Sequence, residues 1–133
     1  MKNYLKIRIK KIQEDKFFEK KIYNLNLKLS GVKEIKLLNK KFRKKNKSTD
    51  ILSFPNYTKL TLKKIININS KIYLGDIIIN IKKMDTSSKI IFKKHLNLLF
   101  IHGLVHLFGY NHKKISDYKK MQTIEKKLLK KIN

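Results

Sequence analysis

The feature that most constrains this chain is the segment His102-Gly-Leu-Val-His-Leu-Phe-Gly-Tyr-Asn-His112, which contains three histidines within eleven residues. His102 and His106 are four residues apart, so on a helix their rings lie one turn apart on the same face. Gly109 can adopt a positive φ and end that helix. The chain can then turn back and bring His112 to the same point. The segment therefore predicts a helix, a sharp turn and a cluster of three imidazoles.

Three neutral imidazoles with an open fourth position are typical of a catalytic zinc site, whereas structural zinc sites usually have four protein ligands. We therefore predict one Zn²⁺ per chain, with His102, His106 and His112 as its ligands. The fourth histidine, His95, precedes His102 by two helical turns. It could support a metal ligand, or it could line a groove or the core.

The spacing of the histidines matches the zinc endopeptidase motif H-E-x-x-H-x-x-G-x-x-H except at one position. The motif has a glutamate after the first histidine, where it acts as the general base. This chain has Gly103 there, which has no side chain. The sequence therefore argues against proteolysis and favours another metal-assisted hydrolysis.

The charge of the chain is extreme, because 34 Lys and Arg residues against 9 Asp and Glu residues give a net charge of +25. One interpretation is a polyanionic partner, with nucleic acid first and an anionic membrane second. The alternative is drift in an AT-rich genome, since the abundant Lys, Ile and Asn all have codons rich in A and T. The chain has no cysteine, which is compatible with a reducing cytosol, and the first ten residues lack the apolar stretch of a signal peptide.

Hydrophobic periodicity predicts a mixture of strands and helices without strict alternation, and hence an α+β (mixed α/β) fold. We expect residues 1–133 to form a single small domain, in which a short, mostly four-stranded sheet packs with helices. The histidine motif would lie at the end of a long central helix. The strands are predicted at residues 5–12, 25–30, 51–54 and 72–81.

Apolar residues at helical spacing predict helices over residues 13–24, 32–42 and 86–108, and a last helix capped by Ser116 or Asp117. Residues 56–70 are polar and rich in lysine. For this segment the sequence predicts a mobile connection.

Arg43 lies within a basic run, residues 40–47, at the end of one of these helices and is one of only two arginines in the chain. It could be a solvated residue that complements the helix dipole, or a bidentate phosphate ligand. Thr49, Asp50 and Asp76 are expected to bind turn or backbone amides. Asp76 could alternatively orient a histidine ligand.

Four segments together resemble the YbeY family of bacterial endoribonucleases. They are Leu38-Asn-x-x-Phe-Arg43, Ser48-Thr-Asp-Ile-Leu-Ser-Phe-Pro55, Leu74-Gly-Asp-Ile77 and the histidine run 102–112. They occur in the order and at about the spacing of that family. The chain departs from the family at Asn111, where an aspartate is usual, and at Ser48, where a proline is usual.

The resemblance implies a cytoplasmic, metal-dependent endoribonuclease specific for single-stranded RNA. It implies a role in rRNA maturation, notably at the 3′ end of 16S rRNA of the small ribosomal subunit, and in ribosome quality control. By the same resemblance, the three histidines correspond to the zinc ligands, and Arg43 to the residue that handles the substrate. No membrane association is implied. The alternative that stays open is a non-catalytic, zinc-containing ribosome-assembly factor that binds rRNA, because Asn111 lacks the carboxylate.

Overall fold

The computed structural model describes residues 5–8 and 22–132 of the chain. Strands and helices follow one another without a strict alternation, which confirms the predicted α+β class. Among the described helices, none is both long enough and apolar enough to cross a membrane. In chain order the elements are β1 (Leu5–Arg8), β2 (Ile22–Ser30), α1 (Val32–Arg43), β3 (Ile51–Pro55), α2 (Lys59–Ile68), β4 (Lys71–Asn80), the 3₁₀ turn η2 (Ile81–Lys83), α3 (Lys89–Leu107) and α4 (Ile115–Ile132).

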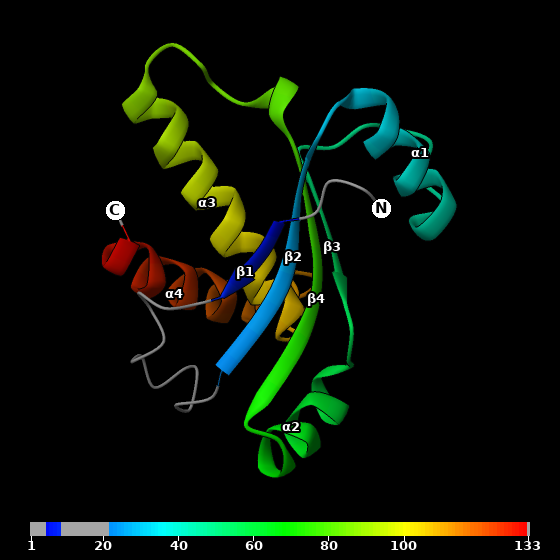
Figure 1. Ribbon diagram of the computed structural model, residues 1–133, viewed down its shortest axis with the longest axis vertical. Helices are drawn as coiled ribbons and strands as arrows, with labels where there is room; N and C mark the ends of the chain where they lie inside the picture. Colours follow the sequence, from blue (N-terminus) through cyan, green and yellow to red (C-terminus); the bar gives the residue numbers. More distant parts are fainter. Residues whose placement is uncertain (1–4, 9–21, 133) are drawn as a thin grey trace.

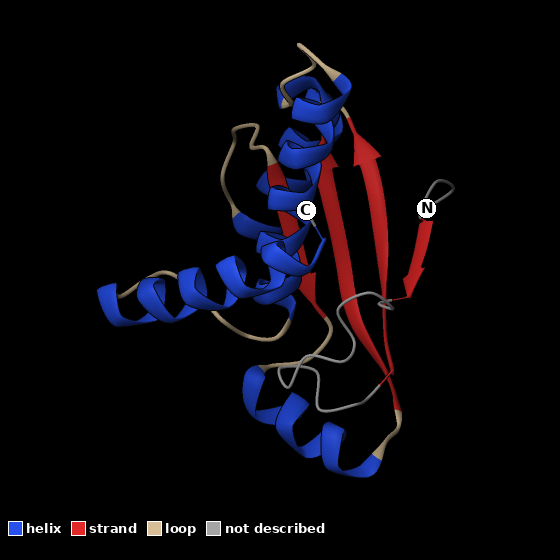
Figure 2. Cartoon of the chain, turned by 90° about the vertical axis from the view of Figure 1, so that its left-hand side faces the viewer, coloured by secondary structure: helices blue, strands red, loops and turns tan. Residues whose placement is uncertain are grey.

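The strands form one sheet in the order β1-β2-β4-β3 (Figure 1). Strands β2, β4 and β3 form its body, and the four-residue β1 pairs with the outer edge of β2. The β2–β4 pair is parallel, whereas the other two pairs are antiparallel. Figure 2 shows the long strands with helices packed beside them.

Strand β4 is covered on both faces, as its continuous run of isoleucines indicates. Ile77 and Ile79 belong to the main core, which includes residues of α3 and α4. Ile78 points the other way and packs with Ile35 of α1 and Leu52 of β3. Helices α3 and α4 therefore cover one face of the sheet and α1 covers part of the other, with α2 at the lower end in Figure 1.

Helix α3 approaches the sheet closely at Gly103. A Cβ atom at this position would lie 2.9 Å from Ile51 Cδ1, 3.0 Å from Ser53 Oγ and 3.1 Å from Ile77 Cγ2. The Ser53 hydroxyl donates a hydrogen bond of 3.3 Å to the Gly103 carbonyl. The missing side chain thus allows close helix–sheet packing, and a glutamate of the peptidase type would require the side chains of Ile51, Ser53 and Ile77 to move.

The helix predicted over residues 13–24 is wrong in its last part. Residues 22–24 belong to β2, and residues 13–21 lie outside the described part of the chain. Tyr23 and Leu25 are buried and share one face of the strand, and the Tyr23 ring packs edge-on against Phe108 at a centroid distance of 5.0 Å. The alternation of period two that indicates a strand begins at Tyr23, and it prevailed there over the helical spacing from which the helix was predicted.

The mobile connection predicted over residues 56–70 is also wrong, because most of it forms α2. The Thr58 side chain caps this helix by accepting a hydrogen bond from the Thr61 amide. Leu62 is buried in the main core, and Ile65 and Ile66 pack against it. The lysines and asparagines between them obscured an amphipathic pattern.

The other helix boundaries differ by a few residues. Helix α3 begins at Lys89 with Ser88 as its cap, three residues after the predicted start. Helix α4 begins at Ile115, so Ser116 and Asp117 lie inside its first turn, and the predicted cap is wrong. The predicted strand from residue 5 is described only as far as Arg8, and its remainder lies outside the described residues.

We expect Gly103→Leu to destabilise the fold by about 1–3 kcal/mol, because the side chain must be inserted between α3 and a well-packed sheet. Leucine is a good helix former, so a loss would come from packing and not from helix propensity. Urea denaturation measures the free energy of unfolding. Gly31→Ser is the control, since nothing lies within 4 Å of a Cβ there. An unchanged stability of Gly103→Leu would contradict the close packing.

Candidate metal centre and basic pocket

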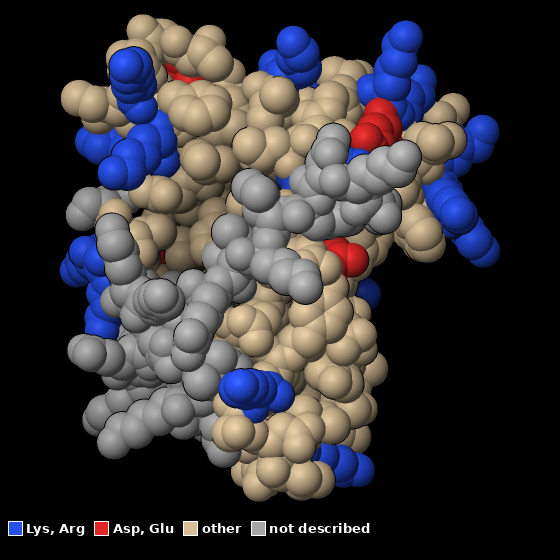
Figure 3. Space-filling model, in the orientation of Figure 1, with Lys and Arg blue, Asp and Glu red and all other residues tan. Residues whose placement is uncertain are grey.

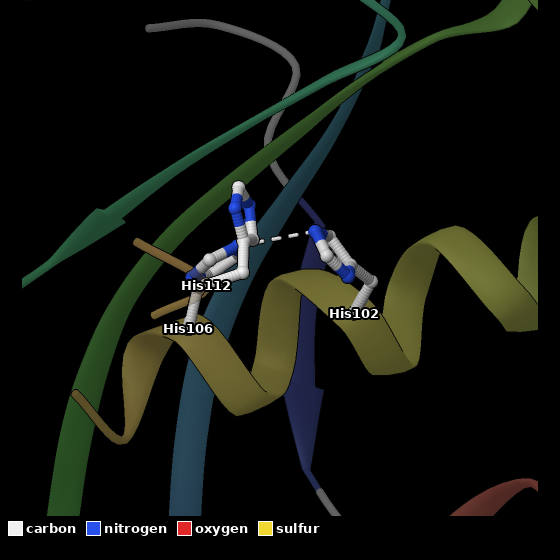
Figure 4. A group of neighbouring side chains, drawn as sticks. All are labelled: His102, His106 and His112. Carbon is white, nitrogen blue, oxygen red and sulfur yellow. Dashed lines mark hydrogen bonds between the residues drawn. The ribbon is translucent and has the colours of Figure 1, made fainter. Parts of the chain in front are cut away.

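The three histidines of the sequence motif come together beside the end of α3 (Figure 4). His102 and His106 lie on its last two turns, and His112 follows the turn after the helix. One ligand nitrogen from each ring lies within 4.8 Å of the others. The first two side chains are half-buried and His112 is exposed. The three imidazoles are therefore placed to hold one metal ion, as the sequence predicted.

Gly109 provides the turn that returns His112 to the helix end. Its φ of +93° is positive, as predicted, and its amide donates a hydrogen bond of 2.9 Å to the His106 carbonyl. A Cβ at Gly109 would lie 2.5 Å from Cβ of Lys59 at the start of α2. Both the backbone conformation and the close approach of α2 therefore require glycine here.

The hydrogen bonds of two rings decide which nitrogens face the centre. His102 Nδ1 lies 2.7 Å from Glu125 Oε1, and His106 Nδ1 lies 2.8 Å from the Tyr110 carbonyl oxygen. A carboxylate and a carbonyl only accept hydrogen bonds, so both Nδ1 atoms donate, and in neutral rings both Nε2 atoms carry lone pairs.

The two Nε2 atoms lie 3.1 Å apart, at the dashed line in Figure 4. Two nitrogens bound to one tetrahedral zinc ion are expected about 3.3 Å apart, from Zn–N distances of about 2.0–2.1 Å. Two lone pairs at this separation repel unless a cation lies between them. The donor set therefore fits a metal ion.

Burial lowers the pKa of His106 below its usual value, and the neighbouring His102 and His112 lower it further. The hydrogen bond to the Tyr110 carbonyl opposes this shift. The net effect keeps His106 neutral near pH 7, which is the form that binds metals.

The histidines open into a pocket of about 670 Å³ that is strongly basic. Arg43 of α1, Lys45 and Lys47 of the following loop, and Lys113 all line it. On the face of the molecule in Figure 3, lysine and arginine side chains lie mainly along the edges, and few acidic side chains are visible. The structure thus brings Arg43 and the histidine cluster, which are distant in sequence, to one pocket.

Two buried asparagines hold the basic loop between α1 and β3. Asn39 of α1 donates a hydrogen bond of 2.8 Å to the Lys47 carbonyl. Asn80, at the end of β4, donates to Ser48 Oγ and to the Thr49 carbonyl, both at 3.2 Å. The two asparagines are 1% and 0% exposed. The loop therefore presents its lysines to the pocket from fixed backbone positions.

A family model described as endoribonuclease YbeY matches residues 1–133. The chain belongs to the YbeY endoribonuclease family. Endoribonuclease YbeY of Pelagibacter ubique is 47% identical over 109 residues, which cover 80% of this chain and 67% of that protein. The Mycoplasma mobile protein of the same name is 33% identical over 121 residues, covering 88% and 77%. A solution structure of a Thermotoga maritima protein gives a TM-score of 0.51 at 28% identity, covering 81% of this chain and 67% of that one.

Other residues singled out from the sequence make hydrogen bonds with partners other than the three clustered histidines. His95 Nδ1 accepts a hydrogen bond of 3.1 Å from the Asp85 amide, before the start of α3. Thr49 Oγ1 donates to the neighbouring Asp50 carboxylate at 3.4 Å. Asp76 accepts hydrogen bonds from Asn26 and from the Tyr73 hydroxyl, which differ from the histidine and the backbone amide considered from the sequence.

The carboxylate that contacts a histidine is Glu125, which sequence reasoning missed. It comes from α4, 23 residues after His102. The sequence feature that could have drawn attention to Glu125 is its rarity. It is the only glutamate after Glu34, and it lies in a helix rich in lysine. Spacing alone could not connect it to His102, since the contact depends on how α4 packs against α3.

We expect Asn80→Ala to destabilise the protein by about 1–3 kcal/mol, because it removes the hydrogen bonds by which this buried side chain holds backbone groups of the loop and of η2. Amide hydrogen exchange in residues 44–50 should become faster, and urea denaturation gives the stability. Asn56→Ala is the control, since that side chain is exposed and makes a long hydrogen bond, of 3.4 Å, to the Tyr73 carbonyl. Equal exchange rates in Asn80→Ala and the wild type would show that the loop is held by other contacts.

Proposed function

We propose that this chain is a zinc-dependent endoribonuclease that cleaves single-stranded RNA. The observation that carries the proposal is the shared pocket, which combines a cluster of three histidines with Arg43 and loop lysines. His102, His106 and His112 would hold one Zn²⁺. Membership in the YbeY endoribonuclease family supports the reaction class.

A zinc ion, when bound, supplies Lewis acidity toward a phosphoryl oxygen and toward water. The chain supplies the positive charge around it. Arg43 can donate two parallel hydrogen bonds to phosphoryl oxygens, which gain negative charge in the transition state. Lys45 and Lys47 add attraction for the phosphates on either side of the scissile bond.

The preference for single strands follows from the shape and charge of the pocket. A flexible single strand can bend its backbone into a concave basic site, whereas an A-form duplex keeps its phosphates on a rigid cylinder. Tyr110 also lines the pocket, but the Lys59 ammonium lies 4.1 Å from the centre of its ring. Recognition would therefore rest on the RNA backbone more than on stacking of bases.

The biological substrate we propose is rRNA, with maturation of the 3′ end of 16S rRNA on the small ribosomal subunit and ribosome quality control as the roles. The net charge of +25 favours a large polyanion such as the ribosomal subunit. The cytoplasm is the corresponding location.

A non-catalytic ribosome-assembly factor is the second candidate, favoured by Asn111. This residue lines the pocket, and an amide cannot act as a base. In that case the zinc would stabilise the fold and the lysines would bind rRNA without cleavage. Cleavage of RNA by the purified wild type decides between the two functions.

We expect His106→Ala to lose zinc and RNA cleavage together, because His106 provides one of the two Nε2 atoms that lie 3.1 Å apart at the centre. Elemental analysis should find one zinc per wild-type chain, and a chelator should reduce wild-type cleavage of a single-stranded RNA to the level of the variant. His95→Ala is the control, since His95 lies outside the cluster. Full zinc occupancy in His106→Ala would refute the ligand assignment.

We expect Arg43→Lys to slow cleavage far more than it weakens RNA binding. The change conserves charge, so long-range attraction is kept, but the forked donor is lost. Loss of such a transition-state contact costs roughly 2.7–4 kcal/mol, or about a hundredfold or more in rate. Single-turnover cleavage and equilibrium binding are measured on the same RNA, with the charge-conserving Lys41→Arg on the same helix as control. Equal losses in cleavage and binding would make Arg43 a docking residue.

A further inference from the structure

Glu125 is the one acidic side chain that contacts the histidine cluster among the described residues. Its Oε1 lies 2.7 Å from His102 Nδ1, and its side chain is 16% exposed. It projects from α4, whereas His102 and His106 belong to α3. The contact therefore joins two helices at the metal centre.

Glu125 is a partly buried carboxylate in a helix rich in lysine. Lys126 and Lys127 follow Glu125 directly, and other lysines surround the segment. Elsewhere in the described residues, Glu34 pairs with a lysine, Lys28. Glu125 thus pairs with a histidine although many lysines are near in sequence.

An ionised carboxylate accepts hydrogen bonds and cannot donate them. Facing Glu125, His102 therefore keeps its proton on Nδ1 and directs the lone pair of Nε2 toward His106, 3.1 Å away. The negative charge also increases the electron density of the imidazole and makes Nε2 a stronger donor to a cation. The Tyr110 carbonyl does the same for His106, but without a charge.

We propose that Glu125 is a positioning residue for the metal centre, which sets the tautomer of His102 and strengthens metal binding from α4. The inference rests on the proposed binding of zinc by the three histidines. It adds a residue from the last helix to a site otherwise built from α3 and the turn after it. Docking of α4 and loading of the metal then support each other, because the ion and the carboxylate hold the same ring from opposite nitrogens.

The test compares Glu125→Gln with Glu34→Gln in the full chain. Both changes remove one carboxylate charge that contacts a cationic or basic group, but Glu34 contacts Lys28, not a histidine. The affinity for zinc is measured by competition with a chromophoric chelator. We expect the affinity of Glu125→Gln to be about 10–100-fold weaker than that of the wild type. The affinity of Glu34→Gln should equal that of the wild type.

A second readout separates positioning from a purely structural contact between α3 and α4. Nitrogen-15 NMR of the metal-free protein reports which ring nitrogen of His102 carries the proton. We expect Nδ1–H in the wild type and in Glu34→Gln, and a mixture of tautomers in Glu125→Gln. Unfolding in urea without metal shows whether the variant remains folded, and Glu125→Leu, which replaces the carboxylate by an apolar side chain, provides a second variant.

Each outcome supports or overturns the inference. Weaker zinc binding by a folded Glu125→Gln, with a changed tautomer, supports it. Wild-type affinity and an unchanged tautomer in that variant overturn it, while the three-histidine site and the proposed function stand. An affinity loss that only follows a loss of folding, with His102 unchanged, makes Glu125 a helix–helix contact and also overturns it. If the wild type binds no zinc, the proposed function and this inference fall together.

Discussion

The close contact of α3 with the sheet at Gly103 is the constraint on which the site depends. It brings the helix backbone against Ile51, Ser53 and Ile77, and so fixes the depth of His102 and His106 relative to β3. The loop that precedes β3 carries Lys45 and Lys47 of the pocket and follows Arg43 directly. A larger residue at position 103 would separate the histidines from that loop. The same glycine removes the general base of a peptidase and allows the packing that joins metal ligands to phosphate-binding groups.

The distribution of charge gives the pocket its chemistry. Among the described residues that line it, Asp50 is the one carboxylate, against Arg43 and three lysines. Glu125 contacts His102 from behind and is not among the lining residues. A negative charge in the pocket would repel RNA phosphates, whereas one behind a ligand strengthens the ligand without meeting the substrate. The proposed nuclease thus separates the carboxylate that supports the metal from the cations that attract the substrate.

The sequence predicted the parts of this arrangement that are encoded locally. The histidine spacing, the positive φ of Gly109, the helix before Arg43 and the isoleucine-rich strand all follow from patterns within a dozen residues. The start of β2 and the whole of α2 were mispredicted. Their structure depends on the burial of Tyr23 and Leu62 in the common core, which local sequence patterns do not show. The contact of Glu125 with His102 was missed for the same reason. It depends on the packing of two helices, which no spacing in the sequence expresses.

At both positions where the chain departs from the family pattern, Asn111 and Ser48, the side chain that is present accepts a hydrogen bond. Asn111 Oδ1 accepts a hydrogen bond of 3.1 Å from the Lys113 amide, which an aspartate oxygen can accept equally well. Ser48 Oγ accepts from the buried Asn80, a bond that a proline cannot make. Asparagine thus keeps the turn that follows the third histidine, and serine adds a contact that holds the basic loop where a proline would restrict its backbone. Asn111 therefore keeps the hydrogen bond of this turn, so an effect of the substitution on cleavage would come from the lost carboxylate, through its charge or its ability to act as a base.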